Sequence, residues 1–296
     1  DYKTKIEGLR EETKIERIEQ AKLHLEAEKI GAPIFKIKQE NLLLNKGFNL
    51  LPQPSACDLF VDFEGVQDYV FPGRLEYLFG IYYEEDGEKF FKPYWAHNKK
   101  EEKKSVIDFF EFTKKHFKKY PNARIFHYAH YEITTLERLT SMFKVHGVDY
   151  DHYLNLGKFV DLFKIVKQAI YVSQKSYSIK DIEKYYDFKR SGDIRKGDVS
   201  EEFYIQWMET EDQKLLDQIG EYNKQDCLST FKLRKWLLKI KPEQTKWFVP
   251  EKEQMELRPY EEVLLEYQTK FNNYKGKKTY LINILSDIVG FYNREQ

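Results

Sequence analysis

The chain has 296 residues, with 49 Lys and Arg residues balanced by 49 Asp and Glu residues. Hydrophobic residues make up 41% and aromatic residues 16% of the sequence, which is enough apolar material for a packed core and excludes a disordered chain. The balanced charge argues against a tail that coats nucleic acid by bulk attraction, but it is compatible with a local basic groove.

The sequence shows neither a membrane span nor a signal segment. Its densest apolar stretch, residues 77–83, is far shorter than the ~20 residues that cross a bilayer. Two cysteines, Cys57 and Cys227, are too few for a disulfide framework, so we expect a reducing, cytoplasmic location. Because the chain opens with Asp1 and not with Met, we also expect it to be a piece of a longer protein.

The first 55 residues are expected to form a helical N-terminal arm. Residues 1–30 carry Ile and Leu at roughly helical spacing among many charges, which predicts an amphipathic helix or helix pair that packs on a neighbour. The segment Leu-Pro-Gln-Pro-Ser at residues 51–55 breaks regular structure and predicts a boundary there.

The pattern then changes to strands. Short runs rich in aromatic and β-branched residues predict strands, and Glu85-Asp86-Gly87 signals a tight turn between the second and third. Longer stretches with helical spacing separate the later runs. The predicted order is three strands, a helix, a strand, a helix and a strand, over residues 59–64, 76–83, 89–95, 101–119, 123–128, 131–145 and 157–162.

From Ser178 onward the pattern is mainly helical. Ser178, with Asp181 three positions later, is typical of a helix start. Residues 212–240 predict a long helix that Lys241-Pro242 ends. Two further helical patterns over residues 258–294 predict a C-terminal helical connector, which we place at residues 243–296.

Strands joined by tight turns pair antiparallel, whereas strands joined through helices add in parallel. The element order therefore predicts an α/β domain over residues 56–242, with a mixed five-stranded sheet flanked by helices. Several folds share this order, so the order by itself assigns no function.

Asp62 and Glu64 interrupt the most apolar predicted strand. Residues two apart on a strand point to the same face, so the two carboxylates are neighbours. A buried carboxylate pair is costly unless a cation or a donor compensates it, and hard cations such as Mg²⁺ prefer carboxylate oxygens. The alternative is a strand end with solvent-exposed acids.

Two further motifs carry acids. Tyr222 and Asp226 are one turn apart on the predicted long helix, near its apolar stripe; the alternative is a surface acid with a half-buried tyrosine. Glu132 follows His127 and His130 where the fourth strand gives way to a helix, and its charge suits a first helical turn. No Cys-x-x-Cys or His-Glu-x-x-His motif accompanies the histidines, which argues against zinc.

Together these motifs resemble the DEDD superfamily of 3′–5′ exonucleases, which has an RNase H-like fold, and the tyrosine is typical of its DEDDy subgroup. Over residues 57–240 the chain is most similar to the YprB-like exonuclease domain of bacterial RecB-like nuclease–helicase proteins. That resemblance rests on residues 62–65 (DFEG), 77–80 (YLFG), 127–132 (HYAHYE), 178–183 (SIKDIE) and 222–227 (YNKQDC). One position departs from the family: most DEDD enzymes have Asp where Glu132 stands, so Asp161 is an alternative ligand.

The resemblance implies a 3′–5′ exonuclease that hydrolyses phosphodiester bonds of single-stranded DNA or RNA, with DNA favoured, by a two-metal mechanism using Mg²⁺ or Mn²⁺. Tyr222 would orient the attacking water, and linked helicase or nuclease domains would complete the protein. The implied metal ligands are Asp62, Glu64, Glu132 and Asp226. Basic and aromatic residues near the motifs suit a single strand, and the candidate contacts are Arg74, Tyr131, Lys189 and Arg190.

Two other functions remain open. One is a catalytically silent scaffold that seats nucleic acid for a partner helicase, and the other is a structure-specific endonuclease on the same fold. The retained acids favour an enzyme over a silent module, because costly acids need a role. The tyrosine one turn before Asp226 favours an exonuclease over an endonuclease.

Overall fold

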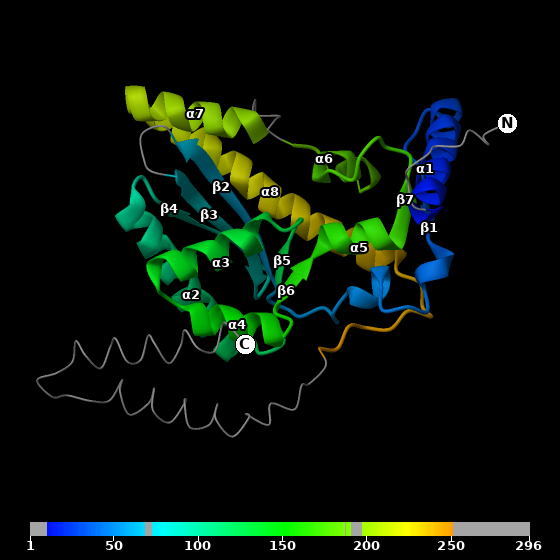
Figure 1. Cartoon of the computed structure of the whole chain (residues 1–296), viewed down its shortest axis with the longest axis horizontal. Coiled ribbons are helices and arrows are strands. Elements are labelled where there is room, and N and C mark those ends of the chain that lie inside the picture. Colours follow the sequence, from blue (N-terminus) through cyan, green and yellow to red (C-terminus); the bar gives the residue numbers. More distant parts are fainter. Residues whose placement is uncertain (1–10, 69–72, 187, 191–196, 251–296) are drawn as a thin grey trace, which may run out of the picture. The chain divides into compact units, whose positions relative to one another are not determined.

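A computed structural model of the chain describes residues 11–68, 73–186, 188–190 and 197–250 (Figure 1). The chain divides into two compact units, Asp1–Val249 and Pro250–Gln296, and the described residues belong to the first apart from Pro250. The helical connector predicted over residues 243–296 lies outside the described residues beyond Pro250, and residues 243–250 contain no helix.

The first unit is built around a mixed sheet of five strands in the order β4-β3-β2-β5-β6 (Figure 1). Strands β2, β3 and β4 pair antiparallel, whereas β5 and β6 add in parallel. The predicted α/β fold with a mixed five-stranded sheet is therefore confirmed. The strands are β2 (Leu59–Asp68), β3 (Gly73–Glu85), β4 (Glu88–Trp95), β5 (Ile125–His127) and β6 (Phe159–Asp161).

The turn between β3 and β4 follows directly from its two central residues. Asp86 and Gly87 have φ angles of 51° and 85°, which is what a two-residue hairpin turn requires at both positions. Asp tolerates this left-handed region better than most residues, and Gly adopts it at no steric cost. The turn thereby fixes the register of β3 against β4.

Helices cover both faces of the sheet (Figure 1). One face carries α8 (Gln213–Ile240) and α5 (Leu162–Ala169), and the short α6 (Ile179–Ile182) and α7 (Gly197–Thr210) pack along α8. The other face carries α2 (Lys99–Lys119), α3 (Tyr131–Phe143) and α4 (Gly147–Asn155). None of the described helices combines the length and the apolarity needed to cross a membrane.

The alternation along β2 assigns its side chains to two apolar layers. Val61 and Phe63 are buried under α2 and α3, whereas Phe60 is buried in the layer beneath α8. Full burial of such a side chain stabilises the fold by roughly 1.5–3 kcal/mol. Because the side-chain period of a strand is two, Asp62 and Glu64 continue the face of Phe60 and point toward α8.

The N-terminal segment contains more than the predicted helix. Helix α1 covers Glu11–Ile30, while residues 1–10 lie outside the described part of the chain. Strand β1 (Phe35–Ile37) then pairs antiparallel with β7 (Ile170–Val172) in a separate two-stranded sheet. The short 3₁₀ helices η1 (Gln39–Asn41) and η2 (Gly47–Leu50) follow, and Phe48 is buried against the α5 layer. The domain boundary at residue 55 stays a prediction.

Candidate active site

Asp62 and Glu64 lie in the middle of β2, opposite Gly80 and Leu78 of β3. Both side chains are half-buried. Just before them on the same face, the ring of Phe60 packs edge-on against Phe231 of α8, with 5.1 Å between the centroids. This aromatic contact holds the helix over the face on which the two carboxylates lie.

Helix α8 brings a third acid to the same place. Asp226 is 8% exposed, and ligand oxygens of Asp62, Glu64 and Asp226 all lie within 4.8 Å of one another. Among the described residues, no comparable group of acids, histidines and cysteines includes His127 or His130. The spacing suits a cation held by oxygen ligands and gives no support to a zinc site.

Glu132 is a fourth acid, in the first turn of α3, and only 3% of its surface is exposed. Its Oε2 lies 3.8 Å from Nδ1 of His127. This oxygen is buried and has no hydrogen-bond partner among the described residues. A buried carboxylate oxygen without a partner is costly, so this atom is suited to bind something from outside the chain.

The four acids perturb one another. Burial, followed by the charges of neighbouring acids, raises the pKa of Asp62 well above its ordinary value. Burial is also the main cause that raises the pKa of Glu64 and of Glu132 to about 8. Burial raises the pKa of Asp226 as well, against the opposing charge of Arg190. The cluster therefore favours bound protons or bound cations over free carboxylates.

A divalent metal fits this set of residues. Asp62, Glu64 and Asp226 supply oxygen ligands at a spacing that one ion can span. Glu132 is not part of this group, but its Oε2 has no hydrogen-bond partner in the described part of the chain. Mg²⁺ and Mn²⁺ prefer such carboxylate sites. The assignment of such a metal rests on this donor set.

A family model of the RNase H superfamily matches residues 59–238. The chain belongs to the RNase H superfamily. The match runs from the start of β2 into the last turn of α8 and so includes all four acids. Comparison with curated proteins and with solved structures finds no match.

In this RNase H-superfamily domain, Asn223 positions Asp62. Its Nδ2 donates to the backbone oxygen of Asp62 at 3.0 Å and to Oδ2 at 2.8 Å. Asn223 is fully buried, and it fits only because residue 80 is glycine: a Cβ on Gly80 would lie 1.8 Å from Asn223 Oδ1. Both residues lie within the motifs at residues 77–80 and 222–227, but no local pattern in the sequence indicates this role.

Asp161, the alternative fourth ligand, lies at the end of β6 as predicted. Its Oδ1 accepts from the backbone N–H of Ala129 at 3.0 Å and from that of Lys164 at 3.2 Å, and the second bond caps helix α5. Ala129 has a φ of 70°, so Asp161 stabilises an unusual turn. One oxygen of Asp161 thus has structural partners, whereas Oε2 of Glu132 has none among the described residues.

Tyr222 lies on α8, one turn before Asp226, and is 6% exposed. Burial, and then the charges of Asp226 and Glu64, raise its pKa far above the ordinary value for tyrosine. The hydroxyl therefore stays protonated at neutral pH. Cations stand over the ring, with Nζ of Lys180 5.4 Å and Cζ of Arg190 5.5 Å from its centroid.

Arg74 and Tyr131, two candidate contacts for nucleic acid, belong to a network around Glu76. Arg74 Nε donates to Glu76 Oε1 at 3.0 Å, Tyr131 OH donates to Oε2 at 2.5 Å, and Arg138 Nη2 donates to Oε1 at 2.6 Å. Glu76 is fully buried. A Cβ on Gly65 would lie 2.0 Å from its Oε2, so the glycine after Glu64 makes room for this network, which the sequence analysis did not foresee.

The other two candidate contacts differ in their surroundings. Lys189 is exposed. Arg190 is largely buried and pairs with Asp226, with 2.5 Å between Nη2 and Oδ1. Arg190 is therefore in direct contact with the acidic cluster.

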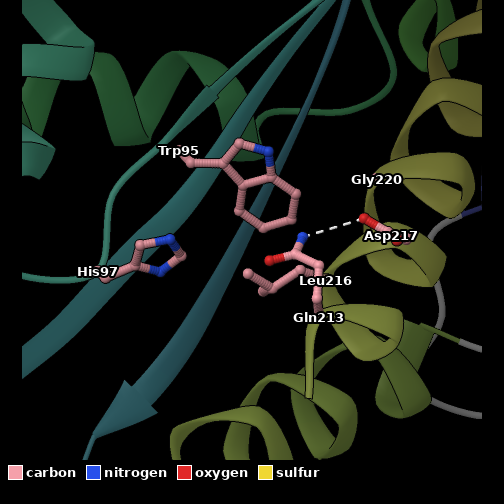
Figure 2. A pocket seen from close by; sticks show the side chains of 6 residues that line it. All are labelled: Trp95, His97, Gln213, Leu216, Asp217 and Gly220. Carbon is pink, nitrogen blue, oxygen red and sulfur yellow. Dashed lines mark hydrogen bonds between the residues drawn. The ribbon is translucent and has the colours of Figure 1, made fainter. Parts of the chain in front are cut away.

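A pocket of about 440 Å³ lies where the end of β4 meets the first turns of α8 (Figure 2). None of the four acids lines it. Gly220 faces Trp95 across the pocket, and a Cβ on Gly220 would lie 3.5 Å from Trp95 Cζ2, an ordinary contact. The lining residues are Trp95, His97, Gln213, Leu216, Asp217 and Gly220.

Proposed function

We propose that this RNase H-superfamily domain is a metal-dependent 3′–5′ exonuclease that hydrolyses phosphodiester bonds of single-stranded nucleic acid, with DNA favoured, by a two-metal mechanism. The observation that carries the proposal is the cluster of ligand oxygens from Asp62, Glu64 and Asp226 within 4.8 Å of one another. The fold and this cluster support a metal-dependent nuclease. The direction of cleavage and the type of strand rest on the resemblance of the motifs to the DEDD superfamily.

Asp62, Glu64, Glu132 and Asp226 would hold Mg²⁺ or Mn²⁺. When bound, two such ions stabilise the attacking and the leaving oxygen of an in-line displacement. The chain fixes the donors: Asn223 donates two hydrogen bonds to Asp62, and Asp62 and Glu64 share one face of a strand. Positioned donors reduce the reorganisation that the reaction requires.

Tyr222 orients the attacking water in this proposal. Its raised pKa keeps the hydroxyl protonated, which suits a hydrogen-bonding group and argues against a strong base. Tyr222→Phe should lower the rate by about 10²–10³-fold, the loss expected for one positioned transition-state contact, with metal affinity nearly unchanged.

Arg74, Tyr131, Lys189 and Arg190 are proposed to contact the substrate strand. Cations along a groove bind the backbone of single strands, and aromatic side chains stack on their bases. We further propose that the domain works in the cytoplasm as one part of a larger nuclease–helicase, on the resemblance to the YprB-like domain. The buried, unpaired Cys57 and Cys227 agree with a reducing compartment.

The scaffold and the endonuclease are the competing functions. The clustered acids argue against the scaffold, because they are costly for the fold. Burial and mutual repulsion raise the pKa values of Asp62 and Glu64, and a module that only binds a polyanion gains nothing from such acids. The endonuclease shares the acids and differs in that it needs no strand end.

Incubation of the chain with end-labelled linear strands and with circular single strands, in Mg²⁺ or Mn²⁺, separates the three functions. An exonuclease releases mononucleotides from the 3′ end and leaves circles intact, an endonuclease cuts circles, and a scaffold binds without cleavage. Asp62→Asn should abolish cleavage, whereas the control Asp108→Asn, on α2 with a partly exposed side chain paired with Lys104, should keep it. Cleavage that persists in Asp62→Asn removes the site assignment.

A further inference from the structure

Arg190 is anchored by a buried carboxylate. Its Nε donates to both carboxylate oxygens of Glu183, at 3.2 and 3.0 Å, and its Nη2 donates to Oε1 at 2.6 Å. Glu183 is itself fixed, because the hydroxyl of Ser229 on α8 donates to its Oε1 at 2.7 Å, and Tyr186 bonds to that hydroxyl at 2.8 Å. The carboxylate of Glu183 thus fixes the plane of the guanidinium through Nε and Nη2.

The front of this guanidinium faces the acidic cluster. Nη2 is shared between Glu183 and Oδ1 of Asp226, which lies 2.5 Å away. Nη1 is buried and has no hydrogen-bond partner among the described residues. A buried guanidinium N–H without a partner is costly, so this group is prepared for an acceptor that enters the site.

Asp226 therefore has two roles in the site. It pairs with Arg190, and it belongs to the carboxylate group that a metal ion fits. A cation beside a cation site opposes metal binding through Coulomb repulsion, and the effect is large where water is excluded. The same side chain would attract a substrate phosphate, because phosphate oxygens accept hydrogen bonds from the paired N–H donors of a guanidinium group.

We propose, resting on the nuclease function above, that Arg190 binds the phosphate at the bond to be cleaved and competes with the metal for Asp226. Glu183 is the positioning residue that holds Arg190 beside the acids. Arg190 pairs with Asp226 in the metal-free chain. When Asp226 is a metal ligand, the Nη1 and Nη2 donors of Arg190 would bind the substrate phosphate. The ligand is a phosphodiester. Arg190 thus weakens the affinity for the metal and strengthens the affinity for the nucleic-acid strand.

The competition between Arg190 and a metal for Asp226 is tested on the nucleic-acid-free chain by calorimetric titration with Mn²⁺. Arg190→Gln removes the competing charge, so Mn²⁺ should bind about tenfold more tightly than to the wild type. Arg190→Lys keeps the charge and should bind Mn²⁺ with nearly wild-type affinity. Equal or weaker Mn²⁺ binding by Arg190→Gln overturns the competition.

The binding of the substrate phosphate by Arg190 is tested by measuring KM and kcat for a single-stranded oligonucleotide at saturating Mn²⁺. Loss of charge-assisted hydrogen bonds to phosphate should raise KM by about 10–100-fold in Arg190→Gln. Arg190→Lys should show most of this increase, because lysine lacks the planar fork. A merely structural role would lower stability without tightening Mn²⁺ binding, and a wild-type KM in both variants overturns the phosphate assignment.

Lys184→Gln is the matched control: this lysine follows Glu183, is 51% exposed and pairs with Asp181, so both affinities should stay at wild-type values. The two proposals fail separately. If the wild-type chain binds Mn²⁺ and cleaves strands but Arg190→Gln changes neither affinity, only the role of Arg190 is wrong. If the wild type binds no Mn²⁺, the nuclease function itself is wrong.

Discussion

The contact between Gly80 and Asn223 allows a sharp test of how the site is held. Gly80→Ala places a Cβ 1.8 Å from Asn223 Oδ1, so the amide must move by more than an ångström. That movement breaks the two hydrogen bonds from Asn223 to Asp62. Overpacking costs typically about 1–3 kcal/mol and each lost hydrogen bond about 1 kcal/mol. We therefore expect Gly80→Ala to destabilise the fold by roughly 3–5 kcal/mol.

The same reasoning predicts strong non-additivity. Asn223→Ala alone should cost roughly 2–3 kcal/mol, because it removes the two hydrogen bonds and leaves a small void. In the double variant the space for the methyl group added at position 80 is free, so the second substitution should add little. The remaining contact is the backbone oxygen of Asp62, 3.2 Å from the added Cβ. The interaction energy of the cycle should then be close to the full cost of Gly80→Ala, about 3–5 kcal/mol in magnitude.

Urea unfolding of the wild type, both single variants and the double variant measures this cycle, with EDTA present to exclude metal. The coupling should disappear when Gly80→Ala is combined with a substitution far from the site. If the two substitutions instead add within ~0.5 kcal/mol, the amide of Asn223 does not occupy the space above Gly80 and does not hold Asp62.

Three further predictions concern the acids and α8. Metal-free wild type should lose stability as pH rises from about 4.5 to about 8, because folding raises the pKa of Glu132 over that range and the folded state then binds more protons than the unfolded state. Glu132→Gln should remove this contribution to the free energy of unfolding, which is on the order of 5 kcal/mol at pH 8. Urea unfolding in EDTA at several pH values measures it, and an unchanged pH dependence of stability contradicts the prediction. Mg²⁺ or Mn²⁺ should raise the Tm of the wild type by mass action and that of Asp62→Asn much less, and stabilisation specific to stoichiometric Zn²⁺ would count against the oxygen site. Gly220→Ala should stabilise the chain by about 0.5–1 kcal/mol, because its Cβ meets Trp95 at an ordinary 3.5 Å; a lower Tm would show that the helix needs glycine there.

The main sheet was predictable because each of its strands and the longer helices has a pattern of its own. The hairpin turn has the two residues that its φ angles require, and the predicted helix over residues 101–119 lies within α2. Helix α5 was missed because it follows β6 without a Gly or Pro between them, so both elements form one apolar run. The pair of β1 with β7 was missed because three-residue strands carry no readable period.

Asp62 and Glu64 could be selected from the sequence because carboxylates inside an apolar strand are conspicuous, although the pattern also allowed a strand end with solvent-exposed acids. The structure places ligand oxygens of both residues within 4.8 Å of those of Asp226. The groups that support them could not be found in the same way. Asn223 looks like an ordinary polar helix residue until the fold places it over Gly80. The pairing of Arg190 with Asp226 likewise joins residues 36 positions apart in the chain, and no local pattern indicates it.

The acids come together only when β2 meets α8, and the bonded residues Asp62 and Asn223 are 161 positions apart in the chain. Closing a loop of that length is entropically costly, so we expect contacts of this kind to form late in folding. Carboxylate repulsion is therefore absent from the early steps and arises when the helix docks. A cation that binds Asp62, Glu64 and Asp226 together would have no complete site before that step, so it would slow unfolding and leave the folding rate nearly unchanged. The lifetime of the folded state would then depend on the metal concentration.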